Sequence, residues 1–205
     1  MLGPAMFVLS ALSAPVVTPD TSRGLPTTYP AGAAWSAQSA AAIVDLTVDP
    51  DGKVIACEVE EVIGDVKLAN RSCRQMLGGK AVPARDPNGQ PVHGVVRTIL
   101  RVLIGANHRA AAMAARVRPD IMLTVNRMPS GYAADNVYAL NLFVAADGQV
   151  QQCEPAEPGA EEPNLQPYFD AACSQARTLK SKIVANEAGI AVPFATKMTV
   201  SFELQ

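Results

Sequence analysis

The residues best suited to chemistry in this chain of 205 residues are its four cysteines. They fall into two groups along the sequence, Cys57 with Cys73 and Cys153 with Cys173. A pair of thiols can form a disulfide, bind zinc or exchange electrons with a substrate. Zinc and redox sites usually contain a Cys-x-x-Cys motif, and the chain has none. We therefore predict two structural disulfides, no metal site and no cofactor.

The histidines and carboxylates do not form a catalytic set. His93 lies in a predicted turn and His108 in a segment between the two halves of the chain. Three glutamates that could supply paired carboxylates lie on or beside one predicted strand: Glu58, Glu60 and Glu61. No glycine-rich loop has the spacing of a phosphate-binding motif. We therefore predict that the protein is not an enzyme, and an enzyme of the cell envelope is the least favoured alternative.

Composition and charge narrow the range of partners. Hydrophobic residues make up 49% of the chain and charged residues 18%, which is typical of a folded globular protein. The formal net charge of -2 provides no basic surface for nucleic acid, so a nucleic-acid partner is not expected. No apolar stretch approaches the ~20 residues that cross a bilayer as a helix.

The N-terminal residues resemble an export signal. The segment 5–17 is almost wholly apolar or small, and a proline-rich polar segment follows it. This is the length of a signal-peptide core, and Ala11-Leu12-Ser13 offers small residues for cleavage. We predict a signal peptide over 1–17 and a proline-rich lead-in over 18–30. Contact with the membrane is expected only if the first segment is retained.

The second half of the chain repeats the pattern of the first. Asp51-Gly52 and Asp147-Gly148 each follow an alternating apolar run and precede a cysteine by the same distance, 96 residues apart. Later matches lie 100 residues apart: Cys73 with Cys173, Gln75 with Gln175, Lys80 with Lys180, Gly89 with Gly189 and Val92 with Val192. One insertion within the turn-rich segment 155–163 reconciles the two offsets.

Each repeat is predicted to contain two strands, a helix and a final strand. Apolar residues alternate in the first strand at 44, 46 and 48, and again at 140, 142 and 144. Asp-Gly then forms a hairpin turn, because glycine adopts the positive φ that such turns need. The alternation breaks near Cys57, which predicts a bulge in the second strand.

The two cysteines of a repeat fall on the second strand and on the helix that covers it. This placement predicts the pairs Cys57–Cys73 and Cys153–Cys173. The fold class is therefore α+β: two tandem β-β-α-β units, each a small antiparallel sheet covered by one helix and closed by a disulfide. The repeats are assigned to 31–105 and 119–205, with an alanine-rich, helical linker at 106–118.

The repeat resembles the C-terminal domain of TonB, the bacterial energy-transducing protein. The segments that carry the resemblance are 43–54, 68–73 and 82–92, followed by the last alternating strand. The second copy matches through its hairpin, helix and last strand. The resemblance implies a periplasmic domain that binds a short segment of an outer-membrane transporter by strand addition along its final strand.

The resemblance also indicates which residues would form the binding edges. They are the final strands at 96–104 and 196–204, with these outward positions as candidates: Arg97, Ile99, Arg101, Lys197, Thr199 and Ser201. The expected function is thus a non-enzymatic binding module of the periplasm, linked to transport across the outer membrane. The alternative is a structural protein of the envelope whose repeats pack on each other or form a homodimer through the same edges.

Overall fold

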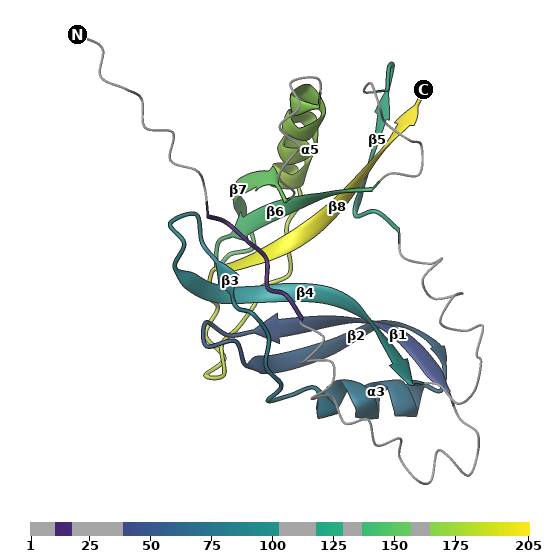
Figure 1. The fold of residues 1–205 in the computed structure, drawn as a ribbon, viewed down its shortest axis with the longest axis vertical. Helices are drawn as coiled ribbons and strands as arrows, with labels where there is room; N and C mark the ends of the chain where they lie inside the picture. The colour runs from purple at the N-terminus through teal and green to yellow at the C-terminus, as the bar shows by residue number, and fades with distance from the viewer. Residues whose placement is uncertain (1–10, 18–38, 103–117, 129–136, 157–164) are drawn as a thin grey trace.

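One mixed β-sheet connects the two halves of the chain in the computed structural model (Figure 1). The structure describes residues 11–17, 39–102, 118–128, 137–156 and 165–205. The whole of the proline-rich lead-in and all of the predicted linker except its last residue lie outside these residues. Within them, no helix is both long enough and apolar enough to cross a membrane.

Both halves contain a hairpin, a helix and a long final strand in that order, to which each half adds one further strand at a different place. The first half contains β1 (Ala40–Val48), β2 (Val54–Gly64), α3 (Val66–Gln75), β3 (Ala84–Arg85) and β4 (Pro91–Val102). The second contains β5 (Ile121–Val125), β6 (Tyr138–Val144), β7 (Val150–Pro155), α5 (Gln166–Thr178) and β8 (Phe194–Leu204). β5 lies at the start of the second repeat, ahead of its hairpin.

The two Asp-Gly turns close the hairpins β1–β2 and β6–β7. Gly52 and Gly148 have φ of 78° and 86°, a region that L-residues with a side chain rarely adopt. A Cβ on Gly52 would stand 2.4 Å from the carbonyl oxygen of Ala81, and one on Gly148 2.5 Å from that of Ser181. Glycine is thus required at both turns by backbone conformation and by close approach of a second segment.

The hairpins are irregular on the strand that carries the cysteine. The pairing of β1 with β2 shifts between Ile43 and Val44 and again between Thr47 and Val48. The pairing of β6 with β7 shifts once, between Phe143 and Val144. A residue left over on one strand bends it and increases its twist. The irregularity predicted near Cys57 is therefore present, with one shift on each side of that residue.

Each helix is held against its hairpin by a disulfide. Cys57 bonds to Cys73 and Cys153 to Cys173, with Cα–Cα distances of 5.7 and 5.6 Å. The predicted pairing is confirmed. α3 begins where the Asp65 carboxylate accepts the N–H of Leu68 at 2.8 Å, a standard helix N-cap.

The two predicted sheets are in fact a single sheet of eight strands. Its main order is β2-β1-β4-β8-β6-β7, while β3 pairs with β4 and β5 with β8. The halves join where His93, Gly94 and Val95 pair in parallel with residues 194–196. The fold is thus α+β, as predicted, but with a mixed sheet rather than two antiparallel ones. The final strands, which the sequence left with open edges, pair with each other at their beginnings.

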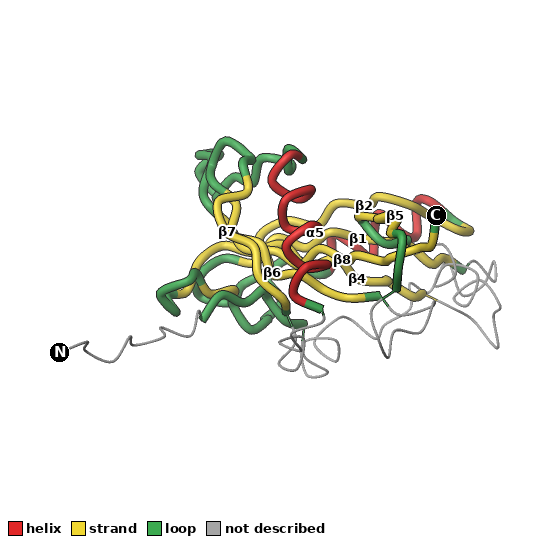
Figure 2. The backbone as a smooth tube through the Cα atoms, turned by 90° about the horizontal axis from the view of Figure 1, so that it is seen from above, coloured by secondary structure: helices red, strands yellow, loops and turns green. Residues whose placement is uncertain are grey.

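The register at this junction places the two helices on opposite faces. Even-numbered residues of β4, such as Val96 and Leu100, pack in the core with α3. Val95 instead packs with the core of α5, because it pairs with Thr196 and points to the same side of the sheet. Figure 1 shows α3 against β1 and β2, and Figures 1 and 2 show α5 beside β6 and β7.

Candidate peptide-binding edge

The final strand of the first half has one side that no described strand occupies beyond the junction. β4 pairs with β1 along 94–102 on one side. On the other side it pairs with β3 at 91–92 and with β8 at 93–95. β4 and β8 then diverge and leave a fork between them (Figure 1). From Arg97 to Val102, this side of β4 has no partner strand among the described residues.

Alternation along β4 identifies the backbone groups that face the fork. The carbonyl oxygen of Val95 accepts a hydrogen bond from Thr196 Oγ1 at 3.0 Å, so the backbone groups of Val95 point toward β8. Every second residue of a strand directs its N–H and C=O to the same side. Arg97, Ile99 and Arg101 therefore present theirs to the unpaired side. These are the three candidate residues of the first predicted edge.

The second predicted edge is not free. β8 is an interior strand that pairs with β6 along 194–200 and with β5 along 200–204. The N–H of Thr199 donates to the Asp120 carboxylate at 2.8 Å, and Ser201 lies opposite Met122 of β5. Lys197 is exposed between the β4 and β5 contacts. β5, which precedes the hairpin of the second repeat, thus covers the side that the sequence left open, and the candidate site is confined to β4.

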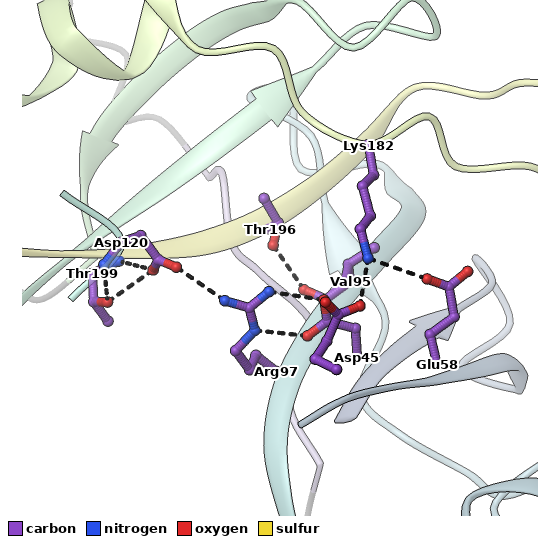
Figure 3. A network of polar contacts seen from close by, with 9 residues as sticks. Asp45, Glu58, Val95, Arg97, Asp120, Lys182, Thr196 and Thr199 are labelled. Carbon is purple, nitrogen blue, oxygen red and sulfur yellow. Dashed lines mark hydrogen bonds and ion pairs between the residues drawn. The ribbon is translucent and has the colours of Figure 1, made fainter. Parts of the chain in front are cut away.

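Arg97 connects the two halves at the mouth of the fork (Figure 3). Its Nε and Nη2 donate to the two carboxylate oxygens of Asp45 on β1, at 2.8 and 2.9 Å. Its Nη1 donates to Asp120 Oδ1 at 3.1 Å, and Asp120 Oδ2 accepts the Thr199 hydroxyl at 2.8 Å. One guanidinium therefore bridges β1 to the start of β5 and, through Asp120, to β8.

The electrostatics of the fork follow from these contacts. The hydrogen bonds that Arg97 donates to the Asp45 carboxylate raise the pKa of Arg97, so the guanidinium stays charged although its side chain is about half covered. Because two carboxylates already occupy its donors, Arg97 is committed to holding the halves together. Arg101 is exposed on the same side of β4 and lies beyond this network.

A second set of ion pairs joins the two halves through Lys182 of the second half and β2 of the first. Lys182 donates to Glu60 and to Glu58, the latter at 3.4 Å, and both glutamates lie on β2 (Figure 3). The hydrogen bond to Glu60 raises the pKa of Lys182. Two of the three glutamates considered as paired carboxylates are thus bound to an ammonium group.

The remaining candidates for chemistry do not converge. His93 is half-buried at the start of the junction, and its burial lowers the pKa of the imidazole. His108 lies outside the described residues. All four cysteines are in disulfides, and the part of the chain that the structure describes has no cluster of three metal-ligating side chains.

Two residues of the fork, Asp45 and Asp120, were not identified from the sequence. Asp45 could have been found from the alternation of β1. It lies between the inward-facing Val44 and Leu46, so its carboxylate points to the other face of the sheet, where a basic side chain could pair with it. Asp120 carried no comparable signal, since its partners Arg97 and Thr199 are brought to it only by the assembly of the sheet.

Comparison with known proteins provides no assignment of class or identity. No family model matches the chain, and no curated protein or solved structure matches it significantly.

Proposed function

We propose that this protein is a non-enzymatic binding module of the periplasm that takes up an extended peptide by strand addition on β4. The observation that supports this most directly is the row of backbone groups at Arg97, Ile99 and Arg101, which face a side without a described partner strand. Such a row can pair with an incoming strand, whose backbone supplies the affinity. A segment of an outer-membrane transporter is the partner class that the TonB-like pattern suggests.

We further propose that the chain consists of two tandem β-β-α-β units derived from one module. Matched contacts support this: the isolated bridge between Lys53 and Lys80 has its counterpart between Gln149 and Lys180. The turns closed by Asp86 N to Gln90 O and by Asn186 N to Ile190 O, at 2.9 and 3.0 Å, also correspond. The strand pairing corresponds as well: Arg97 lies opposite Asp45 in the first unit, and the equivalent residue Lys197 lies opposite Asn141 in the second.

The assignment to the periplasm rests on the two disulfides. Such bonds persist in oxidising compartments and are rare in the cytosol, where thiols are kept reduced. Their positions on a strand and on the helix that covers it are those of structural cross-links. The two disulfides are therefore compatible with an oxidising compartment of a cell envelope.

The experiment is a titration of the isotope-labelled protein with transporter-derived extended peptides, followed by NMR. Shifts are expected at the amides of Arg97, Ile99 and Arg101. Arg101→Pro removes one N–H that faces away from β1, and we expect it to weaken binding about fivefold to tenfold, the effect of losing about one hydrogen bond. Arg101→Ala keeps this N–H and is the matched control, which should bind like the wild type.

Two results would contradict the proposal: no shift of these amides at millimolar peptide, or equal affinity of the proline and alanine variants. The structural alternative, a homodimer through the same edge, predicts instead that β4 amides change with protein concentration in the absence of peptide. Sedimentation velocity over a wide concentration range distinguishes that outcome.

A further inference from the structure

Residues 11–17 lie against the sheet as an added strand, although they are far from it in sequence. The N–H of Ser13 donates to the carbonyl oxygen of Arg85 at 3.1 Å, and the N–H of Arg85 donates back to that of Ser13 at 2.9 Å. Val16 and Val82 exchange a second reciprocal pair, at 3.1 and 2.9 Å. The segment therefore extends the sheet beside β3, as Figure 1 shows.

The segment buries three of its side chains, Leu12, Ala14 and Pro15, while Val16 is exposed. Leu12 is 4% exposed and Ala14 is 7% exposed, whereas Ser13 is only partly buried. Leu12 packs with Ala84 of β3 and Ala195 of β8, beside the partly buried Phe143. The buried positions are thus a leucine, a small side chain two residues later and the proline that follows it.

Small residues on neighbouring strands meet beneath the segment and let it approach the sheet closely, and this contact surface is called the groove below. Ala84, Gly94 and Ala195 come from β3, β4 and β8, and Gly94 pairs directly with Ala195. A Cβ on Gly94 would stand 2.6 Å from the Cβ of Ala84 and 2.7 Å from Cδ of Pro15. Any larger residue at this position would displace the segment or β3.

A buried polar group binds the backbone of the segment. Asn141 of β6 is 8% exposed, and its Nδ2 donates to the carbonyl oxygen of Leu12 at 3.1 Å. A buried amide donor without a partner destabilises a protein, so Asn141 requires an acceptor at this place. It recognises a main-chain carbonyl, which every peptide can supply.

We propose that this groove, formed by Ala84, Gly94, Asn141 and Ala195, is a second peptide-binding site, and that residues 11–17 are its intramolecular occupant. Its ligand is an uncharged extended segment with a leucine-sized residue, a small residue two positions later, and proline next to it. Backbone pairing with 82–85 and the Asn141 hydrogen bond hold the ligand in register. Removal of the segment 1–17 as a signal peptide would leave the groove open to such a ligand. The inference does not rest on the proposed function at β4.

The test starts from the full chain, with a recognition sequence for a specific protease inserted between residues 18 and 38. After cleavage of the folded protein, a fluorescent peptide spanning residues 9–18 is added and its anisotropy is measured. We expect saturable binding. A peptide in which the residues corresponding to Leu12 and Ser13 are exchanged should bind at least about tenfold more weakly, because the leucine then points outward.

Protein variants place the binding in the groove. Asn141→Ala should weaken peptide binding several-fold, whereas Asn70→Ala, the same substitution on α3, should not change it. Arg101→Pro should also leave it unchanged, which separates this site from the proposed edge on β4. Circular dichroism and the two intact disulfides verify that each cleaved variant remains folded.

Three results would overturn the inference. The cleaved N-terminal piece could stay bound without exchanging for the labelled peptide, or the protein could unfold on cleavage; either would make the segment an integral strand. Binding that is indifferent to both the exchanged peptide and Asn141→Ala would show that the groove does not recognise the ligand.

Discussion

Arg97 and Asn141 illustrate how a charged and a neutral side chain have different roles at the boundary between segments. Each lies on a strand next to the junction, and each forms its contact across the boundary of its own half. Arg97 binds the carboxylates of Asp45 and Asp120, whereas Asn141 binds a carbonyl of the N-terminal segment. The charged group fits the wetter mouth of the fork, since an unpaired charge would be costly in the buried groove. There the neutral amide suffices.

We expect Arg97→Ala to lower the free energy of unfolding by about 1–2 kcal/mol, because the bidentate contact with Asp45 is charge-assisted but half-exposed. Arg101→Ala, on the same side of β4 and outside the network, should change stability by less than about 0.5 kcal/mol. Urea unfolding of both variants measures the difference. Equal stability of the two would mean that the bridge contributes nothing.

His93 should make stability depend on pH below neutrality. Burial lowers the pKa of His93 in the folded protein below 6.5, its ordinary value, although the nearby Asp49 opposes the shift. The unfolded chain therefore binds the proton more readily, and the free energy of unfolding falls as the pH decreases from about 6.5 toward the folded pKa.

The measurement is urea unfolding at pH 7.5 and at pH 5.0 for the wild type and His93→Gln. The wild type should lose more stability than the variant between these two values. Other titrating groups contribute equally to both proteins, so the difference isolates the imidazole. An identical loss in the two proteins would show that burial does not affect the protonation of His93.

At the scale of elements, each half combines a hairpin, a helix and a cross-link into a local unit. The turn positions its two strands, and the helix covers the inward residues Val44, Leu46 and Val48, which are all 0% exposed. The disulfides close loops of 16 and 20 residues between strand and helix. Each stabilises the fold by about 3 kcal/mol in the chain-entropy account, a large share for units of this size.

The glycine of the first hairpin turn allows a sharper test than most positions. Gly52 and Gly78 have φ of 78° and 79°, but only Gly52 approaches another segment, the carbonyl of Ala81. Gly78→Ala should therefore cost about 1 kcal/mol from backbone conformation alone. Gly52→Ala should cost at least about 2 kcal/mol, because the new methyl group meets a backbone atom. Thermal or urea unfolding compares the two, and a Gly52 variant no worse than the Gly78 variant would contradict the close approach.

At the scale of the whole molecule, a short junction makes one sheet from two halves. Only three residue pairs join β4 to β8, and Arg97, Lys182 and the N-terminal segment add contacts across the boundary. The two helices lie on opposite faces, so neither helix covers the core of the other. Stability of the assembly thus depends on a small number of contacts near Val95.

We expect Val95→Asp to lower the free energy of unfolding by about 2–3 kcal/mol, because it places a charge against the core that α5 covers. If the sheet unfolds as one unit, the amides of β1 and β6 should lose hydrogen-exchange protection by the same amount. Arg101→Asp, at an exposed position outside the junction, is the control. Loss confined to β6, with β1 unchanged, would show that the halves unfold independently.

The sequence alone determined the local structure of each half. Alternating apolar residues, an Asp-Gly turn and a cysteine on each of two adjacent elements are short-range features, so hairpins, helices and both disulfides could be predicted from them. The α+β class follows from the same patterns. These features depend on neighbours within about twenty residues, where few arrangements satisfy the packing.

Only the tertiary structure decided which edges are free and what the N-terminal segment contacts. Strand pairing uses backbone groups, which every residue carries, so the alternation in β8 is the same whether its sides are open or covered by β4, β5 and β6. An apolar run such as 5–17 suits a signal peptide and an added strand equally well. The small residues beneath Leu12 come from three distant strands, and their meeting depends on a register that no local pattern records.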